Sequence, residues 1–182
     1  MSTIFGLEAE AAVAVAKRDL LRSKFTENAC KIQLRMIASN ADQPAGHEKL
    51  PGKTVLLIDV SGSMFGTKVS DKSDLDRFDA AAALAILARE ICEEVEIYSF
   101  SERAIRVPAR RGMALVEAIR DSQRHSNTRT GDAVRSINAN TNYDRCIIFT
   151  DEQSNDVVPN PTGTGYIINV AAYENGIGNS NW

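Results

Sequence analysis

The stretch Val-Leu-Leu-Ile-Asp-Val-Ser-Gly-Ser-Met, residues 55–64, decides the fold of this chain. Its first four residues form an unbroken apolar run, which predicts a strand buried on both faces of a parallel sheet. The run ends in Asp59, Ser61 and Ser63, three oxygen-bearing side chains at alternate positions. Ligands of open α/β sheets bind beyond the carboxyl ends of the strands, and oxygen donors suit a hard cation such as Mg²⁺. The alternative is a turn in which these side chains bond nearby backbone N–H groups.

Two later segments favour the metal-binding interpretation. Thr128 lies in Ser-Asn-Thr-Arg-Thr-Gly-Asp, just ahead of a helical pattern, and Asp151 ends a second apolar strand that starts at Cys146. Together the three segments resemble the von Willebrand factor type A (vWA) domain and its metal-ion-dependent adhesion site. The resemblance implies that the aspartate and serines of residues 59–63 form the first ligand segment, Thr128 the second and Asp151 the third.

Longer matches narrow the resemblance to the vWA domain of Ro/TROVE-type ribonucleoproteins, including bacterial Ro-like proteins. They are Asp-Val-Ser-Gly-Ser-Met at 59–64, Phe-Thr-Asp-Glu-Gln-Ser at 149–154 and Ile-Asn-Val-Ala-Ala-Tyr-Glu-Asn-Gly-Ile-Gly at 168–178. In that family a ring of helical repeats binds small noncoding RNAs. This chain matches at most the last helices of that ring. The resemblance therefore implies RNA binding for a parent complex and leaves RNA binding by this chain open.

The order of the predicted elements indicates an α/β fold, Rossmann-like and doubly wound, with a mostly parallel sheet, one antiparallel edge strand and added N-terminal helices. After the first strand, the predicted helices and strands are 74 or 76 to 92, 95–100, 104–107, 112–121, 130–139, 145–150 and 166–170.

Two segments are predicted along the chain. Residues 1–50 are expected to be a helical segment and linker, and residues 51–182 the vWA domain. The resemblance implies that this domain lacks the last strand and helix of its family. Either the sequence is a truncated piece of a longer chain, or the N-terminal helices fold back over the exposed sheet edge. The alternative for these helices is a partner-binding helix or the end of a repeat ring.

Composition is that of an ordinary soluble globular protein. The 182 residues are 43% hydrophobic and 25% charged, which suits one α/β domain with an added segment. A net charge of −3 argues against a surface devoted to nucleic acid. No apolar stretch approaches the roughly 20 residues that span a bilayer, so no membrane association is expected. The separated cysteines are expected to be reduced, buried thiols of a cytoplasmic protein: Cys30, Cys92 and Cys146.

The resemblance implies bound Mg²⁺, or alternatively Mn²⁺ or Ca²⁺. Asp59 and Asp151 would supply negative charge and the three hydroxyls neutral oxygen, which leaves a six-oxygen shell unsaturated. In the family the carboxylate of a partner protein completes that shell. The expected function is therefore metal-dependent recognition of an acidic group, with no catalytic residue and no enzymatic activity.

Two alternatives remain open. Arginines flank Thr128 in the sequence, and they would bind RNA phosphate without metal if they point toward the metal face; otherwise they form a solvated face paired with nearby acids. The candidates are Arg110, Arg111, Arg124 and Arg129. The second alternative is a metal-dependent phosphoryl hydrolase, because an aspartate after a central strand can be a nucleophile. Ser61 stands where D-x-D hydrolases carry a second acid, which argues against this alternative.

Overall fold

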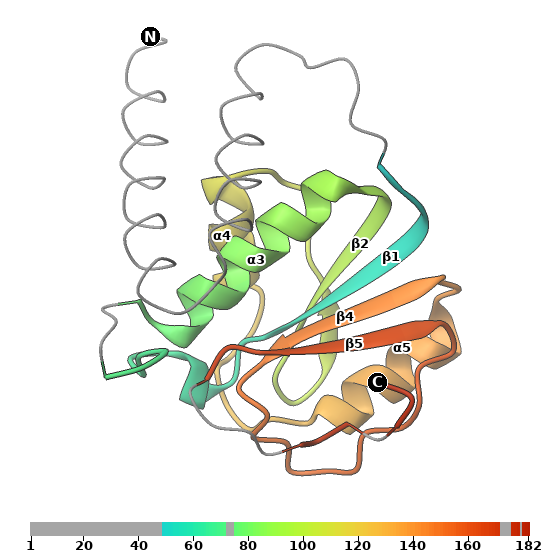
Figure 1. The fold of residues 1–182 in the computed structure, drawn as a ribbon. Coiled ribbons are helices and arrows are strands. Elements are labelled where there is room, and N and C mark those ends of the chain that lie inside the picture. The colour runs from blue at the N-terminus through green and yellow to red at the C-terminus, as the bar shows by residue number, and fades with distance from the viewer. Residues whose placement is uncertain (1–48, 72–74, 172–175, 179) are drawn as a thin grey trace, which may run out of the picture.

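The computed structural model describes residues 49–71, 75–171, 176–178 and 180–182 (Figure 1). The predicted N-terminal helical segment lies outside the described residues. Within them, no helix combines the length and the apolar character needed to cross a membrane.

A sheet of five strands forms the centre of the described part of the chain. Its order is β3-β2-β1-β4-β5, in which β3 pairs antiparallel with β2 and the other pairs are parallel. The strands are β1 (Leu50–Asp59), β2 (Cys92–Phe100), β3 (Ala104–Arg106), β4 (Arg145–Thr150) and β5 (Thr164–Asn169). The predicted mostly parallel sheet with one antiparallel edge strand is confirmed.

Helices cover both faces of this sheet. Figure 1 shows α3 (Arg77–Ile91) and α4 (Met113–Arg120) on one face and α5 (Thr130–Asn140) on the other. The first of these helices was predicted to start at residue 74 or 76, and Asp76 caps it: its Oδ1 accepts from the backbone N–H of Phe78 at 2.9 Å. A short 3₁₀ turn, η1 (Gly62–Met64), follows β1.

The alternation of side chains along β1 builds both halves of the core. Leu56 and Ile58 belong to the cluster formed with α3 and α4, whereas Val55 and Leu57 belong to the cluster formed with α5. All four side chains have an exposed fraction of 0%. The apolar run is therefore buried on both faces, as the sequence predicted.

Strand β2 begins earlier than the sequence predicted. It starts at Cys92, immediately after α3, although Val95 was the first residue with clear strand character. The acidic residues in between pair with the start of β1: Glu94 lies opposite Lys53, whose Nζ is 3.6 Å from its carboxylate. These side chains lie at the solvent-exposed end of the sheet, so the strand carries no apolar signal there.

The prediction of buried, unpaired cysteines is confirmed for the two cysteines that the structure describes. Cys92 and Cys146 are both free and buried. Burial raises the pKa of the Cys146 thiol to about 12, so this thiol stays protonated. Cys30 lies outside the described residues.

The strand order reverses at β1. From β1 the chain passes through α3 to β2 on one side, and it later returns to β4 on the other side of β1. Loops that leave neighbouring strands at such a reversal diverge to opposite faces, which makes this edge the usual ligand position in open α/β sheets. Asp59 ends β1 and Asp151 follows β4, so both predicted carboxylates lie at this edge.

Candidate metal centre

Asp59 is a fully buried carboxylate at the end of β1. Its Oδ1 accepts from the backbone N–H of Ser61 at 2.8 Å, and its Oδ2 accepts from the hydroxyl of Thr150 at 2.6 Å. Burial raises the pKa of Asp59 to about 6, against the opposing effect of these hydrogen bonds, and the charge of Asp151 adds to the rise. At neutral pH this carboxylate is charged and poorly solvated, which favours a nearby cation.

The η1 turn places two hydroxyls beside this carboxylate. Ser61 Oγ lies 3.3 Å from Ser63 Oγ, and Ser61 itself is buried. Neighbouring ligands of an octahedral Mg²⁺ ion, each about 2 Å from the metal, are about 3 Å apart. The spacing of the two serines therefore fits two adjacent ligands of one hard cation.

Asp151 is also fully buried, and it forms an ion pair inside the site. Its Oδ2 accepts from Nη1 of Arg77 at 2.7 Å, and its Oδ1 accepts from the backbone N–H of Gln153 at 3.3 Å. Arg77 is the first residue of α3 and is itself buried. This partner could not be predicted from local sequence pattern, because the two residues are 74 positions apart.

Backbone hydrogen bonds join the segment of Thr128 to the other two predicted ligand segments. Thr128 is buried, and its carbonyl accepts from the backbone N–H of Asn155 in the loop after β4 at 2.9 Å. The carbonyl of Ser126 accepts from the backbone N–H of Gly62 in the η1 turn at 3.0 Å. The structure therefore brings all three segments to one edge of the sheet.

Ser101, just beyond β2, anchors the same segment from the opposite side. Its hydroxyl donates to the carbonyl of Asn127 and accepts from the backbone N–H of Ser126, both at 3.0 Å. Its carbonyl accepts from the backbone N–H of Arg129 at 2.8 Å. Ser101 is fully buried and was not predicted, because an isolated serine after a strand carries no signal of its own.

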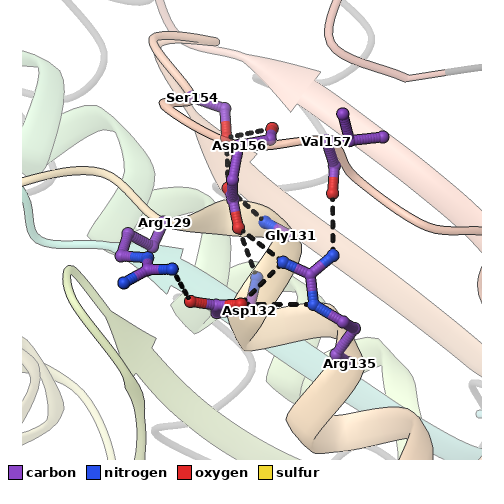
Figure 2. Close-up of polar contacts among 7 residues, drawn as sticks. All are labelled: Arg129, Gly131, Asp132, Arg135, Ser154, Asp156 and Val157. Atoms are coloured by element: carbon purple, nitrogen blue, oxygen red, sulfur yellow. Dashed lines mark hydrogen bonds and ion pairs between the residues drawn. The ribbon is translucent and has the colours of Figure 1, made fainter.

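The carboxylate of Asp156 caps the first turn of α5 (Figure 2). Its Oδ1 accepts from the backbone N–H of Gly131 at 2.9 Å, and its Oδ2 accepts from that of Asp132 at 2.8 Å. Arg135 Nη2 donates to the same Oδ2 at 2.9 Å, and the Ser154 hydroxyl donates to Oδ1 at 3.0 Å. The cap comes from a distant loop, so sequence spacing could not reveal it.

Close approach at Gly131 makes this contact possible. A Cβ at position 131 would lie 2.1 Å from the carbonyl oxygen of Val157 and 2.7 Å from Asp156 Oδ2. Only glycine fits this distance. The loop that carries Asp151 therefore packs directly against the helix that follows Thr128.

The loop also has a strained residue next to the buried carboxylate. Glu152 has a backbone φ of 58°, the one positive value among the described non-glycine residues. Its Oε2 accepts from the backbone N–H of Gly176 at 2.9 Å. Such conformations cost roughly 1–3 kcal/mol and cluster at functional sites.

Of the four predicted anion-binding arginines, Arg110 and Arg111 lie away from this edge. Arg111 Nε lies 3.8 Å from Glu90 near the end of α3, at the amino end of β2, whereas Asp59 pairs with the last residue of β2. Arg110 precedes it in the same exposed loop. Arg124 is exposed in the segment that leads to Thr128.

Arg129 does lie near the edge, but an acid neutralises its charge. Its Nη2 is 2.5 Å from Asp132 Oδ2 (Figure 2). Asp132 also pairs with Arg135 at 2.6 Å, and these arginines hold the pKa of Asp132 below its usual value, with the hydrogen bond from Arg135 as the largest cause. This part of the arginine set is an ion-pair network on α5.

The candidate centre is poor in carboxylates. Among the described residues, no group of three or more His, Cys, Asp or Glu side chains could hold a metal. The edge described above instead combines two carboxylates with serine and threonine hydroxyls. A hard cation bound there would keep positions for water or an external anion.

Comparison with known proteins relates this chain to a family. The family model described as the Ro60 vWA domain matches residues 53–164, which is more than half of the chain. The fold is similar to that in the crystal structure of the Deinococcus radiodurans RO (RSR) protein, with a TM-score of 0.60 and 18% identity. That likeness covers 92% of this chain and 38% of the Deinococcus chain. None of the curated proteins matches.

Replacing Asp59 with Asn should stabilise the metal-free protein at pH 7.5 by on the order of 1–3 kcal/mol, because it removes a buried charge. The pKa of Asp59 rises from 3.8 to about 6 on folding. The loss of stability that its buried charge causes is therefore absent below pH 3.8 and complete above about pH 6. The extra stability of Asp59→Asn should therefore shrink toward pH 4. Urea unfolding in EDTA measures the free energy of unfolding, with the exposed substitution Glu102→Gln as the control. A less stable Asp59→Asn protein at pH 7.5 would contradict this account.

Replacing Gly131 with Ala should destabilise the protein by about 1–3 kcal/mol, although alanine is the better helix former. The added Cβ would overlap the Val157 carbonyl and push the loop off α5. Ser136→Ala, at an exposed position of the same helix, should change the free energy of unfolding by less than about 0.5 kcal/mol. Equal stability of the two variants in urea unfolding would show that the contact at Gly131 is unimportant.

Proposed function

Because the chain belongs to the Ro60 vWA domain family, we propose that it is a non-catalytic module that binds an acidic group of a partner protein through a divalent cation. The cation would be Mg²⁺, or alternatively Mn²⁺ or Ca²⁺. One observation carries the proposal: Ser61 Oγ and Ser63 Oγ lie 3.3 Å apart beside the buried carboxylate of Asp59.

The hydroxyls of Ser61, Ser63 and Thr128 would be the direct protein ligands. Both carboxylate oxygens of Asp59 already accept hydrogen bonds, from Ser61 and Thr150, so this side chain would act through water as well as by its charge. Asp151 would contribute in the same way from the other strand. The bound cation would supply a positive centre with exchangeable positions, where a carboxylate can replace water.

Binding is favoured over turnover by the kind of side chains present. Phosphoryl hydrolases of the D-x-D type need a second acid two positions after the nucleophile, and this chain has Ser61 there. We therefore propose that the centre recognises an acidic group without transforming it.

The family also suggests a ribonucleoprotein context. This chain spans 38% of the length of the Deinococcus Ro protein, so RNA binding by a whole Ro-like protein is a separate matter from binding by this module. We favour a protein partner here, because Arg129 is paired with Asp132 and Arg111 lies beside Glu90. Direct RNA binding would instead depend steeply on salt and ignore EDTA.

The double variant Ser61→Ala, Ser63→Ala should lose affinity for Mn²⁺ and Mg²⁺ by at least about 10–100-fold, since it removes two adjacent oxygen ligands without changing charge. Isothermal titration measures the affinity, and Ser136→Ala serves as the control that keeps it. Undiminished binding by the double variant, or no binding by the unaltered chain at millimolar metal, would overturn the proposed function.

A further inference from the structure

We propose that Arg77 is a fixed internal cation of the candidate centre, which weakens its affinity for divalent metal and gives the occupied centre a net positive charge that selects a carboxylate ligand. This inference rests on the proposed function and concerns how that same site is tuned. It assigns a role to a residue outside the three ligand segments.

The ion pair of Arg77 lies inside the site. Its Nη1 is 2.7 Å from Asp151 Oδ2, and the exposed fractions of the two side chains are 10% and 0%. Charges this deeply buried interact strongly, because water screens them little. A divalent cation near Asp151 would therefore meet a positive charge that is already bound to the same carboxylate.

The backbone around Arg77 keeps this charge in place. The N–H of Arg77 donates to the carbonyl of Thr67 at 3.0 Å. The preceding residue, Asp76, accepts from the backbone N–H of Gly66 at 2.8 Å and from that of Phe78 at 2.9 Å. The loop that leaves the serine turn thus returns to fix the start of α3, so the guanidinium is held beside Asp151.

The balance of charge indicates what the occupied centre would bind. The site holds two carboxylates, Asp59 and Asp151, and the ion pair with Arg77 offsets one of their two negative charges. A divalent cation would then leave one net positive charge among largely buried groups. One carboxylate from outside would neutralise it, whereas without Arg77 the occupied centre would already be neutral.

The variant Arg77→Met tests this role, because methionine keeps an unbranched apolar side chain and removes the charge. We expect its dissociation constant for Mn²⁺ to fall at least tenfold in isothermal titration. The rise in melting temperature on adding Mn²⁺ should also exceed that of the unaltered chain, because the metal would offset the buried charge of Asp151 that loses its partner. Arg120→Met is the matched control, since Arg120 pairs with Asp79 at 3.2 Å on the surface and should leave metal affinity unchanged.

Sodium acetate provides the carboxylate probe. In the unaltered chain acetate should strengthen Mn²⁺ binding, since the two ligands favour each other reciprocally. In Arg77→Met the same acetate concentration should have a clearly smaller effect. If Arg77→Met folds only with metal, Arg77→Lys, which keeps the charge, should bind Mn²⁺ within about threefold of the unaltered chain.

The outcomes separate this inference from the function on which it rests. Equal or weaker Mn²⁺ binding by Arg77→Met would overturn the role of Arg77 while leaving metal binding intact. Binding by Arg77→Met alone would support that role and overturn metal binding by the unaltered chain. Absence of binding by both proteins would overturn both.

Discussion

The rest of this structure depends on two carboxylates that are buried at one edge of the parallel sheet. The strand order reverses at β1, which brings Asp59 and Asp151 together where solvent is excluded. Buried charge of one sign must be offset by hydrogen bonds or by opposite charge. Thr150 and the backbone of Ser61 donate hydrogen bonds to Asp59, and Arg77 forms an ion pair with Asp151. Burial raises the pKa of Asp59 despite these hydrogen bonds, so a cation beside this carboxylate would stabilise its charged form.

Backbone hydrogen bonds hold the loops around these carboxylates to one another. Backbone hydrogen bonds join the serine turn to the segment of Thr128, and that segment to the loop after β4. Asp156 fastens this loop to α5, and Gly131 allows the contact. Sites fixed in this way lose little conformational entropy on binding, which suits recognition by a few well-placed oxygens.

Much of this arrangement could be predicted from local pattern. The apolar run of β1 and the side chains that follow it indicate a buried parallel strand with ligands at its end, and the structure confirms that strand and the fold class. The position of Asp151 at the same edge as Asp59 follows from the shared direction of β1 and β4. These are properties of neighbouring residues and of sheet geometry.

The rest depends on tertiary contacts that sequence spacing does not encode. Arg77 meets Asp151 because of how a loop returns to the start of α3, and Asp156 caps a helix from another loop. Arg111 lies far along the sheet from the candidate centre, because β3 and the loop after it carry this residue to the amino end of β2. Proximity to Thr128 in the sequence therefore did not predict where Arg111 lies. The most direct test of the centre is anomalous difference density from crystals grown with Mn²⁺. The account predicts one peak in contact with the hydroxyl oxygens of Ser61 and Ser63; a peak elsewhere, or none at saturating Mn²⁺, would contradict it.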